Sequence, residues 1–87
     1  MFSVRIYLTH ICPYCHMALR LLEQKQVAAE KIFIDDLPER RREMVQLAGK
    51  TSVPQIFVGQ THVGGYRELA KLDADGELDN LLQARNA

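Results

Sequence analysis

The two cysteines of this chain, Cys12 and Cys15, are its most constraining feature, because they are its only cysteines and two residues separate them. Residues 3–8 before them read as a strand, and apolar residues at helical spacing predict a helix over 13–26. Proline is favoured at the first position of a helix, where its missing N–H is not needed. Pro13 therefore indicates that Cys12 caps the start of this helix.

The position of Cys12 predicts a reactive thiol. A capping side chain accepts hydrogen bonds from free N–H groups of the first turn, here those of Tyr14 and Cys15. The thiolate is the attacking form of cysteine, and the N-terminus of a helix favours that form. Residues three apart on a helix lie about 5–6 Å from each other, which is within reach of a disulfide. We therefore expect Cys12 to attack a disulfide and Cys15 to resolve the product.

Two other interpretations of the pair stay open. The cysteines could be small buried hydrophobic residues that share a helix face by chance. They could also be half of a zinc or iron–sulfur site, with His10 and His16 close by in the sequence. A structural zinc site has four ligands, and the chain holds no second Cys-x-x-Cys. A proline inside the motif, between a strand and a helix, favours the redox dithiol, so we expect no metal.

Length and charge narrow the classes of function. A chain of 87 residues predicts one domain, residues 1–87. With 11 basic and 11 acidic residues the net charge is zero, which argues against nucleic acid or an anionic membrane as the main partner. No apolar run approaches the roughly 20 residues of a membrane span. A Cys-x-x-Cys pair without a recognisable secretory signal favours the reducing cytoplasm. We expect a monomer.

The order of the predicted elements is that of a thioredoxin-like α/β fold. Strand, helix and strand within about thirty residues form a βαβ unit with parallel strands. After it come a helix, two strands joined by a Gly-X turn, and two short helices. We expect a four-stranded mixed sheet with helices on both faces, in the order β-α-β-α-β-β-α-α. The predicted ranges are 3–8, 13–26, 31–34, 38–48, 54–58, 61–63, 66–73 and 76–85.

Two further segments are candidates for the walls of a cleft. An X-Pro bond adopts the cis form at modest cost, and a cis bond at Val53-Pro54 would turn the backbone of Val53 toward an extended peptide. A proline at the first residue of a strand also has a plain structural explanation. In Val63-Gly64-Gly65-Tyr66 the glycines allow close backbone approach, and the N–H groups of Tyr66 and Arg67 would bind a carboxylate. Such glycines can also form a simple turn.

Taken together, these motifs resemble those of the dithiol glutaredoxins, and the similarity runs from end to end. It rests on Cys12-Pro13-Tyr14-Cys15, Thr51-Ser52-Val53-Pro54-Gln55-Ile56-Phe57 and Val63-Gly64-Gly65, together with segments near both ends. The resemblance implies thiol–disulfide exchange with glutathione as co-substrate. The implied partners are disulfide-containing or glutathionylated proteins, with ribonucleotide reductase among the family's substrates.

The resemblance also implies roles for individual residues. Cys12 would be the nucleophile and Cys15 the resolving thiol, supported by Pro13, Tyr14 and a cis Pro54. Val53 would pair with the backbone of glutathione. Beside Gly65, the N–H groups of Tyr66 and Arg67 would bind its γ-glutamyl carboxylate.

The chain departs from the family pattern at three positions. Thr9 stands where members often carry a lysine that holds the glycine carboxylate of glutathione, and Tyr66-Arg67 replaces a Cys-Asp or Ser-Asp pair. Arg41 in the second helix could supply the missing positive charge, or belong to a solvated face. These departures leave open a redoxin that thioredoxin reductase reduces, beside the metal-binding module considered above.

Overall fold

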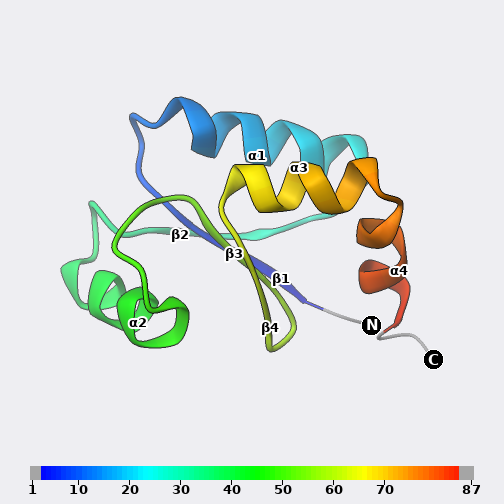
Figure 1. Cartoon of the computed structure of the whole chain (residues 1–87). Helices are drawn as coiled ribbons and strands as arrows, with labels where there is room; N and C mark the ends of the chain where they lie inside the picture. Colours follow the sequence, from blue (N-terminus) through cyan, green and yellow to red (C-terminus); the bar gives the residue numbers. More distant parts are fainter. Residues whose placement is uncertain (1–2, 85–87) are drawn as a thin grey trace.

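A computed structural model describes residues 3–84 of the chain as a central sheet with four helices around it (Figure 1). The fold is the thioredoxin-like α/β arrangement that the element order predicts. The strands are β1 Val4–Leu8, β2 Glu30–Phe33, β3 Gln55–Val58 and β4 Thr61–Gly64. The helices are α1 Pro13–Gln24, α2 Pro38–Ala48, α3 Tyr66–Ala74 and α4 Glu77–Ala84.

The sheet is mixed and four-stranded, in the order β2-β1-β3-β4. Strand β1 runs parallel to β2 and antiparallel to β3, and β3 runs antiparallel to β4. Because β1 and β3 are antiparallel, the end of β1 lies beside the start of β3, where Tyr7 pairs with Gln55. This pairing brings the loop after β1 and the loop before β3 to the same end of the sheet.

Helices cover both faces of the sheet, as predicted. Helices α1 and α3 lie on one face with α4 at its end, and α2 lies on the other (Figure 1). Along β1, Ile6 and Leu8 face the α1–α3 side while Tyr7 faces α2, and all three are buried. A strand buried on both faces carries mostly apolar residues, which explains why β1 is apolar except for Arg5 and β3 is apolar after Gln55.

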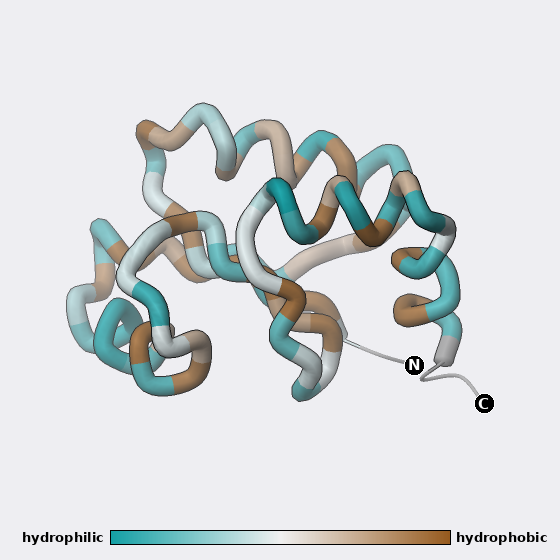
Figure 2. Tube along the Cα trace, in the orientation of Figure 1, coloured by the Kyte–Doolittle hydropathy of each residue, from teal (hydrophilic) through white to brown (hydrophobic). Residues whose placement is uncertain are grey.

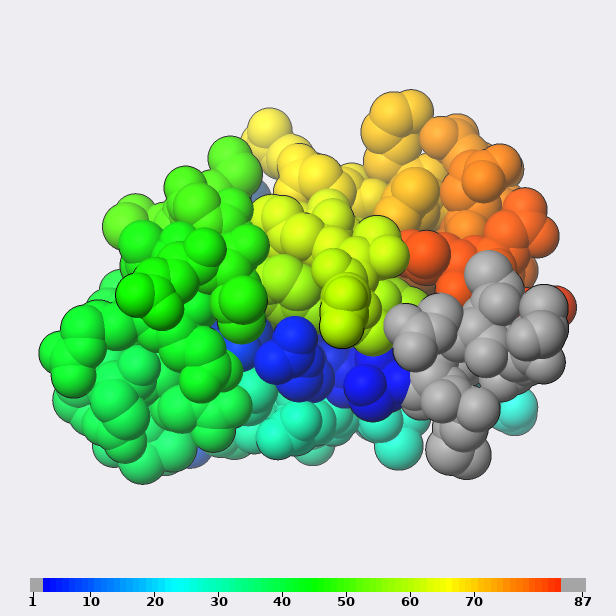
Figure 3. Space-filling model, turned by 90° about the horizontal axis from the view of Figure 1, so that it is seen from below, coloured from blue at the N-terminus to red at the C-terminus, as the bar shows by residue number. Residues whose placement is uncertain are grey.

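The two faces are covered to different extents. Figure 2 shows hydrophobic and hydrophilic residues alternating along α1 and α3, whereas α2 is largely hydrophilic. Met44 is the buried residue of α2, packed against Tyr7, Ile32, Ile34 and Phe57. Seen from the α2 side, β1 reaches the surface beside α2 (Figure 3). The α1–α3 side therefore contributes most of the hydrophobic stabilisation.

Helix α1 is shorter than the predicted range of 13–26. It ends at Gln24 because Gln26 adopts a left-handed φ of +60°, and the N–H of Val27 turns back to the carbonyl of Leu22. The remaining boundaries agree with prediction to within one residue, and the predicted end of the last helix at residue 85 lies outside the described residues. No helix within residues 3–84 has the length and apolar character to span a membrane.

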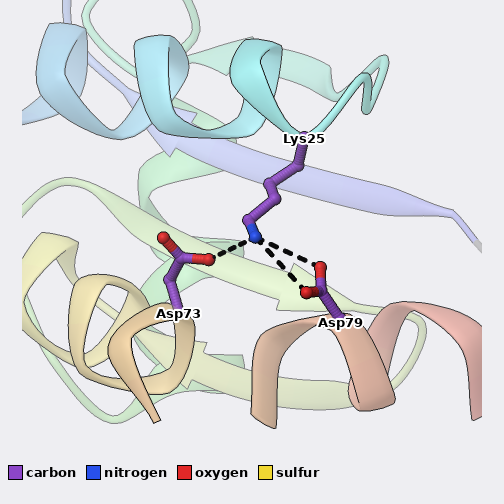
Figure 4. Close-up of polar contacts among 3 residues, drawn as sticks. All are labelled: Lys25, Asp73 and Asp79. Carbon is purple, nitrogen blue, oxygen red and sulfur yellow. Dashed lines mark hydrogen bonds and ion pairs between the residues drawn. The ribbon is translucent and has the colours of Figure 1, made fainter. Parts of the chain in front are cut away.

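Lys25, at the end of α1, joins the three helices on this side. Its ammonium group forms ion pairs with Asp73 of α3 and Asp79 of α4 (Figure 4). These two carboxylates, Asp73 first, raise the pKa of Lys25. The lysine side chain is 25% exposed, so the contact is partly sheltered from water. It holds the short α4 against the rest of the layer.

A hydrogen bond from Tyr7 connects the sheet to α2 on the other side. The hydroxyl of the buried Tyr7 donates to Glu43, whose carboxylate also accepts from Arg40 at 3.1 Å. The bond from Tyr7 is the main reason why the pKa of Glu43 is lowered. A carboxyl group with a lowered pKa stabilises the fold above its unfolded pKa, and this contribution is lost as the pH falls through the folded value.

We predict that Tyr7→Phe lowers the free energy of unfolding by about 1 kcal/mol at pH 7. This is below the usual range for a bond to a charged acceptor, because the Glu43 side chain is 37% exposed. The difference from wild type should shrink as the pH falls through the lowered pKa of Glu43. Urea unfolding at pH 7 and pH 3 would measure it, with the exposed Tyr14→Phe as the matched control. An equal loss at both pH values would contradict the assignment to Glu43.

Candidate active site

Cys12 caps α1 as its sequence context predicts. It has extended backbone angles, φ −154° and ψ 103°, and Pro13 occupies the first helical position. The Sγ atom of Cys12 accepts a hydrogen bond from the backbone N–H of Cys15 at 3.2 Å. The second expected donor, the N–H of Tyr14, forms no such bond among the contacts of residues 3–84. One amide and the positive end of the helix therefore face this sulfur.

The two thiols lie in different environments. Cys12 is partly exposed, whereas Cys15 is fully buried with Ala18 and Leu22 on the inner face of α1. Burial, followed by the hydrogen bond to Cys12, raises the pKa of the Cys15 thiol to about 12. Cys15 is therefore a neutral thiol at pH 7, and Cys12 is the sulfur that an incoming disulfide can reach.

A cleft of about 350 Å³ lies beside the start of α1. Its walls come from three segments that are far apart in the sequence: the start of α1, the loop before β3 and the start of α3. The lining residues are Tyr14, Lys50, Ser52, Val53, Pro54, Gln55, Gly65, Tyr66, Arg67 and Glu68. The thiol of Cys12 lies 4.0 Å from the carbonyl oxygen of Val53, which places the sulfur next to this wall.

The proline loop and the glycine pair are in close contact. The Val53-Pro54 peptide bond is cis. A Cβ atom at Gly65 would lie 3.4 Å from the carbonyl oxygen of Pro54. At Gly64, φ is +117° and a Cβ atom would lie 2.9 Å from the Glu68 carboxylate, so only glycine fits there. The start of α3 therefore lies against the loop before β3, and glycine at position 64 allows the backbone conformation that leads into this helix.

The start of α3 is capped by its own glutamate. Oε1 of Glu68 accepts a hydrogen bond from the N–H of Gly65 at 2.7 Å. The next N–H groups, of Tyr66 and Arg67, belong to the first turn, where a helix supplies no partners of its own. The ring of Tyr66 lies 6.3 Å from that of Tyr14 and connects α3 to the start of α1.

Most of the predicted site residues come together, and Arg41 does not. Cys12, Cys15 and Pro13 form the start of α1, and the cleft is lined by Tyr14, Val53, Pro54, Gly65, Tyr66 and Arg67. Arg41 is exposed on α2 and is not among the lining residues. Lys50, just before the proline loop, is the second basic side chain of the lining besides Arg67.

His10 forms contacts that the sequence did not indicate. Its ring stacks on Phe33 at 4.0 Å, its Nε2 lies 2.8 Å from Asp36, and its backbone N–H donates to Asp35 at 3.0 Å. The hydrogen bond to Asp36 raises the pKa of His10. These contacts attach the loop that carries Cys12 to the turn after β2. In the sequence, the one feature that could have indicated these contacts is the adjacent pair Asp35-Asp36 directly after a predicted strand.

Comparison with known proteins agrees with this geometry. The glutaredoxin family model matches residues 4–63. A glutaredoxin of Neisseria meningitidis is 49% identical over 81 residues, covering 92% of this chain and 95% of the relative. This chain belongs to the glutaredoxin family. Glutaredoxins are thiol–disulfide oxidoreductases, and that is the class of enzyme to which the protein belongs.

Two further relatives cover nearly the whole chain. Glutaredoxin 3 of Escherichia coli is 46% identical over 83 residues, covering 95% of this chain and 100% of the relative. The solved structure of a buckwheat glutaredoxin–glutathione complex matches with a TM-score of 0.88 and 25% identity, over 99% of this chain and 81% of that one. The glutaredoxin fold therefore extends well beyond residues 4–63.

We predict that iodoacetamide at pH 7 alkylates Cys12 and spares Cys15 in the reduced, folded protein. A thiol with a pKa near 12 is almost entirely protonated at pH 7, so Cys15 should react at least about a hundredfold more slowly. Fragment-ion mass spectrometry would assign the label, because both cysteines fall in one tryptic peptide. Both should be labelled in 6 M guanidinium chloride. Equal labelling in the folded state would contradict the assigned environments.

Proposed function

We propose that this glutaredoxin uses glutathione as its electron donor to reduce protein disulfides and mixed disulfides between proteins and glutathione. One observation carries the proposal: the accessible sulfur of Cys12 borders a cleft that presents peptide backbone on one wall and a helix start on the other. Glutathione is a short peptide with a thiol and two carboxylates, which fits both walls. The solved complex of the buckwheat relative with glutathione supports the same choice of ligand.

Each wall of the cleft would bind one part of glutathione. The backbone of Val53, next to the cis Pro54, would pair with the peptide backbone of the ligand in the manner of an added strand. The N–H groups of Tyr66 and Arg67 would bind the γ-glutamyl carboxylate at the start of α3. Gly65 lines the same wall of the cleft. Tyr14 and Pro13 flank the sulfur, and the distant Arg41 would contribute no more than a long-range positive charge.

The reduction of a glutathione mixed disulfide needs Cys12 alone. The Cys12 thiolate attacks the glutathione sulfur, a new disulfide forms between Cys12 and glutathione, and the protein thiolate leaves and takes up a proton. A second glutathione thiolate then attacks the glutathione sulfur held by Cys12. This step releases oxidised glutathione and restores the Cys12 thiolate.

The reduction of a protein disulfide needs both cysteines. Cys12 attacks one substrate sulfur, and the second substrate sulfur leaves as a thiol. Cys15 then loses its proton and attacks Sγ of Cys12, which releases the first substrate sulfur and closes the Cys12–Cys15 disulfide. Two glutathione molecules reduce that disulfide. We place this cycle in the cytoplasm, where a glutathione pool keeps thiols reduced, and assign it to a monomer.

We predict that Cys12→Ser abolishes both reactions and that Cys15→Ser abolishes only the second. Serine at position 15 removes the resolving sulfur and leaves the attacking sulfur in place. Reduction of a glutathionylated peptide should therefore persist in Cys15→Ser, while reduction of a peptide disulfide should fall to background. Release of the free peptide thiol would be followed by chromatography. Turnover by Cys12→Ser would exclude the assigned nucleophile.

The reductant is tested by supplying each system separately to the wild-type protein. One arm contains glutathione, glutathione reductase and NADPH, and the other contains thioredoxin reductase and NADPH. With a glutathionylated peptide as substrate, we expect NADPH consumption in the first arm at a rate at least about tenfold above the second. The opposite ranking would show a redoxin that depends on thioredoxin reductase and would overturn the proposed use of glutathione.

A further inference from the structure

Gln55 is the buried polar side chain within residues 3–84 that the proposed reaction does not use. It is the first residue of β3, directly after Pro54, and only 1% of it is exposed. On the α2 side of the sheet it follows the same alternation as Phe57, where an apolar residue would be expected. A buried amide is stabilising only if its donors and acceptor find partners.

The amide of Gln55 has partners on both sides. Its Nε2 donates to the carbonyl oxygen of Ser52 at 3.0 Å and lies 3.3 Å from the Ser52 hydroxyl. Its Oε1 accepts from Nε2 of His62 at 2.7 Å. The bond to a carbonyl oxygen, which can only accept, fixes which end of the amide is the nitrogen. His62 therefore donates, with its proton on Nε2.

His62 itself is held in place by its neighbours in the hairpin. It pairs with Phe57 across β3 and β4, and the two rings lie 4.9 Å apart. Its ring is thereby set toward Gln55 rather than toward solvent. The hydrogen bond from His62 on β4 thus orients the side-chain amide of Gln55 on β3. That amide reaches back along the chain, past Pro54 and Val53, to Ser52.

We propose that Gln55, oriented by His62, is a positioning residue that holds Ser52 and thereby fixes the backbone of Val53 beside Cys12. The side chain of Gln55 closes the loop from Ser52 to Gln55 by its hydrogen bond to the carbonyl oxygen of Ser52. Val53 lies inside this closed loop, and its carbonyl is the one that lies 4.0 Å from the Cys12 sulfur. The inference rests on the proposed function, because that proposal pairs the backbone of Val53 with the peptide backbone of glutathione.

The decisive variant is Gln55→Glu. It keeps the shape of the side chain and an acceptor for His62. In its ionised form, which the donor His62 favours, it cannot donate to Ser52. We expect the KM for a glutathionylated peptide to rise roughly tenfold. A change of this size corresponds to the loss of one to two ordinary hydrogen bonds. The KM for the same peptide in a mixed disulfide with cysteine should stay within about twofold, because cysteine lacks the peptide backbone that Val53 would bind.

A second measurement tests the positioning role without glutathione. The backbone order parameters of Ser52 and Val53, from ¹⁵N relaxation, should fall from about 0.85 toward 0.6 in Gln55→Glu. His62→Leu should lower them in the same direction, since the amide loses its orienting donor. Gln46→Leu, at an exposed glutamine of α2, is the matched control and should change neither KM nor order.

The outcomes separate this inference from the proposed function. Unchanged order parameters in both Gln55→Glu and His62→Leu would overturn the positioning role. Should wild type act on the two mixed disulfides with equal KM, the proposed preference for glutathione fails, and the order parameters still decide the role of Gln55. An equal rise of KM for both peptides would also overturn the inference, because it would place the effect on Cys12 rather than on Val53.

Discussion

The start of α1 is the feature on which the chemistry of this protein depends. One turn of helix puts two identical side chains into opposite surroundings: Cys12 at the capping position, facing an amide and the cleft, and Cys15 inside the core. Since the raised pKa of Cys15 follows from burial first, the packing of α1 on the sheet would determine which sulfur attacks in the proposed mechanism. The proposed order of the two chemical steps would thus follow from the orientation of the helix.

The cleft exists because three segments of the chain meet at one end of the sheet. The antiparallel pairing of β1 with β3 brings the end of one beside the start of the other, and the pairing of β3 with β4 brings Gly64 opposite Ile56. The dithiol follows the end of β1, and the proline loop precedes the start of β3. The start of α3 follows the end of β4. A rigid sheet buried on both faces therefore positions all three loops, although they are separated by about fifty residues.

The sequence was sufficient for the elements, their order and the cap at Cys12, because each follows from local rules: hydrophobic spacing, proline at a helix start, glycine at a turn. Contacts between distant side chains could not be predicted in this way. The pair His62–Gln55 requires the register in which His62 lies opposite Phe57, two residues from Gln55, and no local pattern specifies that register. The contact of His10 with Asp35 and Asp36 likewise needs β1 and β2 to be adjacent. Helix α1 ended early because Gln26, a residue without turn preference, takes a left-handed conformation.

The charges that line the cleft explain how the departures from the family pattern fit the proposed ligand. Glu68 is committed to the N–H of Gly65, which leaves Lys50 and Arg67 as the cations of the lining. Two cations and one anion give the lining a net charge of +1, since Lys50 and Arg67 contribute +2 and Glu68 contributes −1. Glutathione at pH 7 carries two carboxylates and one ammonium group, the complementary balance. If glutathione binds as proposed, Arg67 would attract its carboxylates, and salt would weaken this attraction because Arg67 is exposed. Under the proposed function, the affinity for glutathione should therefore fall with ionic strength more steeply than in a relative that carries aspartate at the same position.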